Sequence, residues 1–134
     1  MFKRISITVV FVMLIASVLT ACGGAPAPVT FSSLPVFTGA TESTNEVATA
    51  TLTTLTDAAK TDPNAKNVQA KAYDVPAGTT LDAVKAFYKA ALEKDSWKEA
   101  QSSADGVAYV RGNQQMVFKY ADGVGLFVMM VDTK

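Results

Sequence analysis

Apolar and polar residues alternate regularly in the last part of the chain. Three such runs, at residues 107–111, 114–121 and 124–132, are separated by Gly112-Asn113 and by Asp122-Gly123. Both dipeptides are typical of tight hairpin turns, because glycine, asparagine and aspartate tolerate the positive φ angles that these turns need. The pattern therefore predicts three antiparallel strands joined in a meander.

The last of these runs is apolar on both of its faces. Alternate residues make the two faces: Leu126, Val128 and Met130 form one, and Phe127, Met129 and Val131 form the other. Such a strand is expected to be central and to need a cover on each side. For the face with Phe127, Met129 and Val131, two explanations are open. Either the helix near 45–60 or the segment 34–37 covers it, or the three residues form an interaction face for a partner.

A first helix is expected at about residues 45–60. Ala48, Leu52, Leu55 and Ala59 recur at steps of four, three and four, which is the spacing of one helical face. The segment from Ser43 to Glu46 has the spacing of a capping box, and Asp62-Pro63 would end the helix. Residues 67–75 then alternate in the manner of a half-buried strand.

A second helix is expected between residues 80 and 95. It has a wide apolar stripe at helical spacing, which consists of Leu81, Val84, Phe87, Tyr88, Ala91 and Leu92. Thr79 is the expected N-cap, and Trp97 either starts a short strand or closes the helix end. Together these elements predict an α+β domain in which two helices pack on an antiparallel sheet of about four to five strands.

The N-terminus has a different pattern, made of a short basic start and a long apolar run. Lys3 and Arg4 precede an uncharged stretch from Ile5 to Leu19, and Leu19-Thr20-Ala21-Cys22 follows. This arrangement resembles the lipobox signal peptides of bacterial lipoproteins. The resemblance implies that residues 1–21 are removed and that Cys22, the single cysteine, carries the lipid. An uncleaved transmembrane helix is a poorer explanation, because a span needs about 20 apolar residues.

The lipobox also divides the rest of the chain. Residues 22–33 contain small residues and spaced prolines, which predicts a flexible tether that could hold the domain about 30 Å from the bilayer. Residues 34–134 then form the single α+β domain. Here Leu34-Pro35-Val36-Phe37-Thr38-Gly39-Ala40, with Phe87-Tyr88 and Trp97 further along, is similar to small uncharacterised exported lipoproteins whose domain starts with Leu-Pro-Val-Tyr-Pro-Gly-Ala. That resemblance implies an exported α+β domain and supplies no catalytic residue.

The amino-acid composition limits the ligands and the catalytic groups that this protein could use. Without the signal the chain would carry ten basic and twelve acidic residues, a net charge of −2, which disfavours nucleic acid as a partner. The sequence has no histidine and no second cysteine, so we expect no metal, no cofactor and no nucleophile–base pair. Carboxylate pairs such as Asp57 with Asp62, or Asp95 with Glu99, have the spacing of solvated helix faces.

The sequence thus predicts a protein anchored to the cell membrane by its N-terminal lipid, with the domain on the extracytoplasmic side. The expected function is a non-catalytic binding or accessory module of the cell envelope, with an envelope protein as a candidate partner. The alternative is a structural subunit of an envelope protein complex. An enzyme is the least favoured class, because only carboxylates, hydroxyls and amines remain for catalysis.

Overall fold

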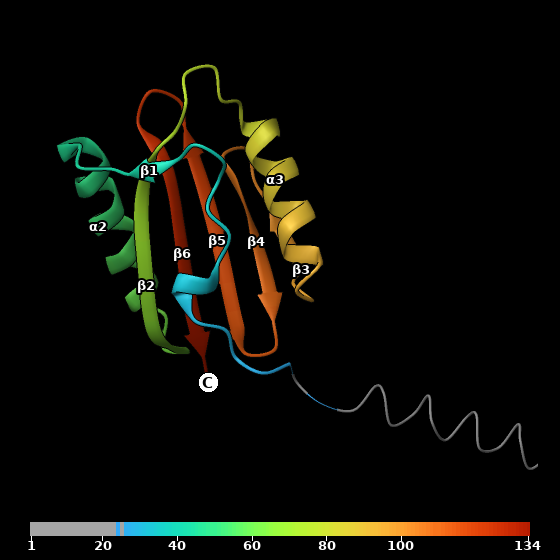
Figure 1. The fold of residues 1–134 in the computed structure, drawn as a ribbon. Helices are drawn as coiled ribbons and strands as arrows, with labels where there is room; N and C mark the ends of the chain where they lie inside the picture. The colour runs from blue at the N-terminus through green and yellow to red at the C-terminus, as the bar shows by residue number, and fades with distance from the viewer. Residues whose placement is uncertain (1–23, 25) are drawn as a thin grey trace, which may run out of the picture.

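A computed structural model describes Gly24 and residues 26–134. Six strands form one antiparallel sheet, and two helices and a short 3₁₀ turn accompany it (Figure 1). The elements in chain order are η1 (Phe31–Ser33), β1 (Thr41–Glu42), α2 (Glu46–Lys60), β2 (Ala65–Asp74), α3 (Leu81–Glu93), β3 (Lys98–Ser102), β4 (Gly106–Arg111), β5 (Gln114–Ala121) and β6 (Gly125–Thr133). The α+β class predicted from the pattern is therefore confirmed.

The strand order is β1-β2-β6-β5-β4-β3, so the prediction of four to five strands was too low. The strand that the pattern missed is β1, whose two exposed residues are too few to show any alternation. It is defined only by its pairing with Tyr73 and Asp74 of β2. The apolar strand β6 lies between β2 and β5, in the central position that its two apolar faces predicted.

Helix α3 packs on one face of the sheet and encloses the main core. Val84, Tyr88 and Leu92 point into this core, and the Tyr88 ring stacks on Phe118 of β5 with ring centroids 4.8 Å apart. The buried residues that meet them from the sheet are Val107, Tyr109, Met116, Phe118, Leu126, Val128 and Met130. The predicted stripe is thus the packing face of α3, although Phe87 is only partly buried.

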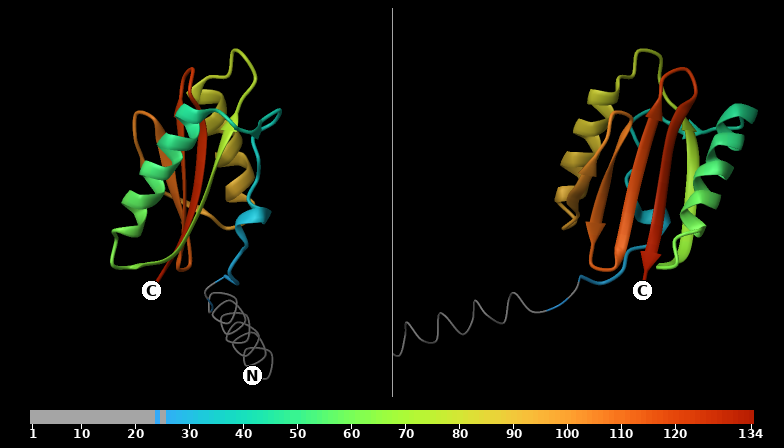
Figure 2. Two further views of the ribbon diagram at one scale, coloured as in Figure 1. Left: turned by 90° about the vertical axis from the view of Figure 1, so that its left-hand side faces the viewer. Right: turned by 180° about the vertical axis from the view of Figure 1, so that it is seen from behind.

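Helix α2 lies on the opposite face, over β2 and β6. Ala48 of the helix contacts Ala72 of β2 and Phe127 of β6 in a second, smaller core. Seen from behind, β4 and β5 carry no helix on this side, and α2 stands beside them at the β2 edge (Figure 2). One face of the sheet is therefore covered only in part.

Both helices begin one or two residues later than the spacing suggested. The N-cap of α2 is Asn45, whose side chain accepts a hydrogen bond from Val47 N at 2.8 Å. The N-cap of α3 is Thr80, whose hydroxyl accepts from Ala83 N at 3.2 Å. Ser43 and Thr79 precede these caps and stabilise the turns that lead into the helices.

Candidate functional site

The chain enters the domain through the residues before β1, and we call residues 26–37 the strap. Val29 of the strap pairs with Gln114 at the start of β5. The amide oxygen of Gln114 accepts from Val29 N at 2.8 Å, and its Nε2 donates to Val29 O at 2.9 Å. Arg111 donates a further hydrogen bond to the carbonyl of Ala27. The strap is therefore attached to the sheet by both side-chain and backbone groups.

Gln114 is buried, with 4% of its surface exposed, and it is the one buried polar residue in the part of the chain that the structure describes. Its Nε2 donates a second hydrogen bond, to Asp132 Oδ1 at 2.9 Å. A buried amide is stable when its donors and acceptor are satisfied, and here the Val29 backbone of the strap supplies one donor and one acceptor.

The apolar residues of the strap complete the main core. Leu34 is buried there, Phe31 is partly buried, and the Phe37 ring meets the Phe87 ring edge-on at 5.3 Å. The strap crosses the face of the sheet that carries α3 (Figure 1). Residues 27–33, which the sequence suggested were a flexible tether, are thus joined to the domain.

The proposed interaction face of Phe127, Met129 and Val131 lies on the α2 side of the sheet. Phe127 is 3% exposed and Val131 is 6% exposed, whereas Met129 is partly exposed. Phe127 packs against α2. Of the two explanations, the first is therefore correct for Phe127: the helix near 45–60 covers it. The segment 34–37 lies on the other face and covers none of these residues. As a correction, Phe127 and Val131 belong to the interior, and only Met129 borders an open surface.

That open surface lies on β4 and β5, and we call Val110, Gln115 and Val117 the open sheet face; Ala108, on the same side, is buried. Ala108 pairs with Val117 and Val110 pairs with Gln115, so the four side chains share one side of the sheet. Val117 in turn pairs with Met129 of β6. A shallow hollow of about 260 Å³ lies over Ala108, Gln115 and Val117.

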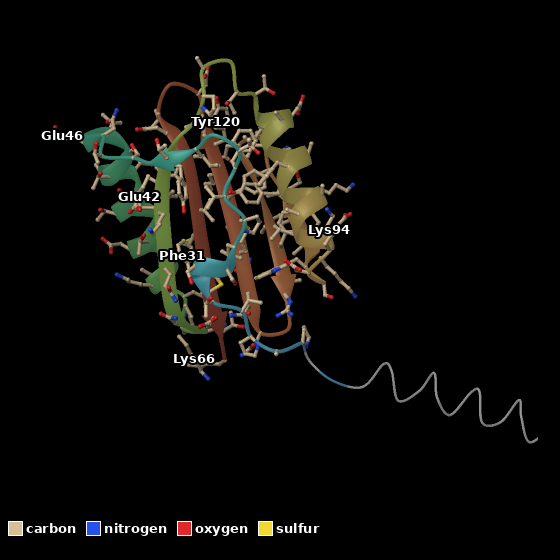
Figure 3. All side chains as sticks on the ribbon, viewed as in Figure 1. Phe31, Glu42, Glu46, Lys66, Lys94 and Tyr120 are labelled. Atoms are coloured by element: carbon tan, nitrogen blue, oxygen red, sulfur yellow. The ribbon has the colours of Figure 1, made fainter. Side chains whose placement is uncertain are left out.

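A more polar hollow lies at the end of the sheet where Tyr120 is found, labelled at the top of Figure 3. This loop-end hollow has a volume of about 280 Å³. Its lining comes from the start of α2, the β2–α3 loop and the β5–β6 turn, and comprises Asn45, Asp74, Val75, Pro76, Ala77, Gly78, Tyr120, Ala121, Asp122, Gly123, Val124 and Gly125. The sequence identified the turn at Asp122-Gly123 but gave no signal that it meets the β2–α3 loop.

The loop-end hollow is rich in hydrogen-bond acceptors. Asp74 and Asp122 supply carboxylates, Asn45 supplies an amide, and lysine and arginine are absent from the lining. The Tyr120 hydroxyl donates to Thr79 O at 2.8 Å and lies 3.3 Å from Asp122 Oδ1. Burial and the Asp122 carboxylate raise the pKa of Tyr120, so this hydroxyl stays protonated at neutral pH. Such a lining suits a ligand with hydroxyl or amino donors.

One further polar group, the hydroxyl of Tyr88, is buried and takes part in no candidate site. The Tyr88 hydroxyl makes no hydrogen bond of normal geometry among residues 26–134; burial raises the pKa of Tyr88, and the nearby Phe37 backbone offsets this only in part. A cavity of about 210 Å³ on that face is lined by strap residues and by Lys71, Tyr73 and Val128, and Tyr88 is not part of its lining. We assign Tyr88 to the core.

Cys22, the predicted lipidation site, lies outside the described residues. Within the described part of the chain, no group of three acidic, histidine or cysteine side chains is placed to hold a metal ion. The helices described there are all too short or too polar to cross a membrane. No protein-family model, no curated protein and no solved structure matches this chain.

Proposed function

We propose that this protein is a lipid-anchored, non-catalytic binding module of the cell envelope, with its domain on the extracytoplasmic side. The proposal of an anchor rests on the N-terminal sequence, in which a basic start and an apolar run end at Leu19-Thr20-Ala21-Cys22. The proposal of binding rests on the loop-end hollow. A concave site with a few convergent polar groups is the usual form of a small-ligand site.

The observation that carries the binding role is the position of the hollow relative to the strap. The strap enters beside Gly112, where Pro26 occupies the space that a side chain on Gly112 would contact, at the end of the sheet opposite Tyr120. A chain attached to a membrane through its N-terminus would therefore leave the hollow unobstructed. We assign it a small ligand bearing hydroxyl or amino groups, because its side chains offer acceptors.

The anchor is tested by mass spectrometry of the N-terminal peptide from isolated membranes. Lipidation predicts a diacylglyceryl-modified Cys22, and Cys22→Ser is expected to give unprocessed precursor or soluble protein. An unmodified Cys22 in a chain that still fractionates with membranes would refute the lipid anchor.

The binding role is tested with glucosamine as a probe, since it carries both hydroxyl groups and an amine. In the full chain in detergent micelles, we expect the amide resonances of Gly123 and Gly125 to shift on titration. Asp122→Asn should weaken the response, whereas Asp57→Asn, on the exposed face of α2, should leave it unchanged. Absence of any shift in the unmodified protein would remove the hollow as a site for this ligand class.

A second function, as a structural subunit of an envelope complex, is favoured by the open sheet face. Val110 is 39% exposed there, and Val117 and Met129, which pair with each other, are partly exposed on the same side of the sheet. Exposed apolar surface of this kind marks interaction sites when it is contiguous. A photo-crosslinker at Val110 should give a discrete product in intact membranes, and one at Lys89, on exposed α3 surface, should not. Equal crosslinking at both positions would argue against this role.

A further inference from the structure

The attachment of the strap shortens the free chain between the domain and the expected lipid. Ala27 and Val29 are already bonded to Arg111 and Gln114, so only the residues from Cys22 to Ala27 connect the expected lipid to the domain. Five residue steps span at most about 18 Å when fully extended. The reach is thus well below the value of about 30 Å expected for a tether ending at residue 33.

Part of this chain length of about 18 Å lies within the headgroup layer of the membrane. The headgroup layer on each side of a bilayer is roughly 5–8 Å thick. A lipidated cysteine starts within this layer, so about 10 Å of chain remains outside it. That distance is close to the Debye length of about 8–10 Å at physiological salt, within which surface charges still interact.

The end of the domain that the short tether reaches is formed by the turn at 112–113 and by the α2–β2 turn, and we call it the turn end. Lys134 N donates to Asn64 O at 3.0 Å, and the Lys134 ammonium donates to Pro63 O at 2.7 Å, which brings β6 and the α2–β2 turn together there. Lys66 lies at this end, at the bottom of Figure 3. The cations placed there are Lys60, Lys66, Arg111 and Lys134, and the carboxylates are those of Asp57, Asp62, Asp132 and Asp95, whose backbone carbonyl accepts from Arg111. Lys60 pairs with Asp57 at 3.9 Å, so the two signs nearly balance and Lys66 is an exposed cation without an ion pair among the described residues.

The opposite end is acidic. Its loops and the strand and helix ends beside them carry Glu46, Asp74, Asp82, Asp105 and Asp122. Lys85 and Lys119 lie among them, and Lys119 pairs with Asp105 at 3.1 Å. An anionic bilayer surface would therefore repel this end more strongly than the turn end.

We propose that the turn end is a membrane-contacting surface, held against anionic lipid headgroups by the short free chain and by Lys66 and its neighbouring cations. The domain then stands with β5 pointing away from the bilayer. The eight residues of β5 place the loop-end hollow about 25 Å beyond the turn end. The inference rests on the proposed lipid anchor at Cys22.

The test is fluorescence quenching of the full, lipidated chain in vesicles of phosphatidylethanolamine and phosphatidylglycerol that contain a headgroup-labelled nitroxide lipid. A lipidated Cys22 has no free thiol, so a cysteine introduced at Asn113 or Ala77 takes the dye alone. We expect the nitroxide to quench the dye at Asn113, in the turn end, and to leave the dye at Ala77, beside the hollow, unquenched. Equal quenching at both positions, or stronger quenching at Ala77, would overturn the proposal.

Two variants test separately whether the tether length and the charge of Lys66 hold the turn end against the bilayer. Ten glycine and serine residues inserted after Gly24 should reduce quenching at Asn113, and unchanged quenching would show that tether length does not set the contact. Lys66→Glu should also reduce it, whereas Lys89→Glu, which makes the same charge change on exposed α3 surface, should not. Equal effects of the two charge reversals would refute a specific role for the turn end.

Mass spectrometry of the same sample distinguishes failure of the inference from failure of the anchor. If Cys22 is unmodified, the lipid anchor itself fails and the membrane-contacting surface fails with it. If Cys22 is lipidated and the two dyes are equally quenched, the anchor stands and only the membrane-contacting surface is refuted.

Discussion

The side chain of Gln114 holds the backbone of Val29 as a paired strand would: its Oε1 accepts from Val29 N at 2.8 Å, and its Nε2 donates to Val29 O at 2.9 Å. The two residues are 85 positions apart in sequence. This pairing joins the entry segment to the central part of the sheet. It therefore decides where the free chain ends and the domain begins.

Replacing Gln114 with alanine should release the strap. The variant leaves the Val29 N–H and the Val29 carbonyl without their buried partner, and we expect a loss of about 1–3 kcal/mol in the free energy of unfolding. Hydrogen exchange at the Val29 amide should also become faster. Gln115→Ala is the control, because Gln115 faces the open side of the sheet, and it should change neither measurement appreciably. Equal losses for the two variants would contradict the pairing.

Replacing Phe127 with alanine should destabilise the domain by about 3–5 kcal/mol, because the ring is buried between β6 and α2. Val110→Ala, on the open sheet face, should cost no more than about 0.5 kcal/mol. Chemical unfolding monitored by Trp97 fluorescence measures both. A loss below about 1 kcal/mol for Phe127→Ala would indicate that Phe127 is exposed, and it would again be a candidate interaction residue.

Replacing Tyr88 with phenylalanine should leave stability unchanged or raise it slightly. The hydroxyl is buried and has no partner within residues 26–134, so its removal eliminates a desolvation cost while the stacking on Phe118 is kept. Tyr109→Phe offers a comparison at a second buried tyrosine. A loss above about 1 kcal/mol for Tyr88→Phe would show that the hydroxyl is hydrogen-bonded in solution.

The pairing of Asp105 predicts a pH-dependent contribution to stability. Hydrogen bonds from Ser103 and Lys119 lower the pKa of Asp105 below its ordinary value of 3.8. A carboxylate whose folded-state pKa is depressed stabilises the fold above the unfolded pKa, and this contribution is lost as the pH falls through the folded value. Asp105→Asn should therefore cost about 0.5 kcal/mol at pH 7, since the pair is exposed. The difference between the two proteins should shrink as the pH falls below 3.8, the ordinary pKa of an aspartate, and a constant difference would contradict the pairing.

The sequence by itself determined the elements that have a strong local period. The stripe of Val84, Tyr88 and Leu92 predicted α3, and the turns at 112–113 and 122–123 predicted the meander of β4, β5 and β6. Two apolar faces were enough to place β6 at the centre of the sheet. These features depend on residues close together in the chain, where periodicity and turn chemistry are sufficient.

Only the tertiary structure decided which distant segments meet. The two residues of β1 are too short for a pattern, and the strap has the composition of a flexible linker until Gln114 binds it. The sequence left two explanations for what covers Phe127. An apolar stripe on a helix predicts that this face is buried, but it does not show which strand the face packs against. The loop-end hollow likewise exists because Pro76 and Asp122, from separate turns, lie at the same end of the sheet. Long-range contacts of this kind are set by packing and closure of the whole chain, which local periodicity does not encode.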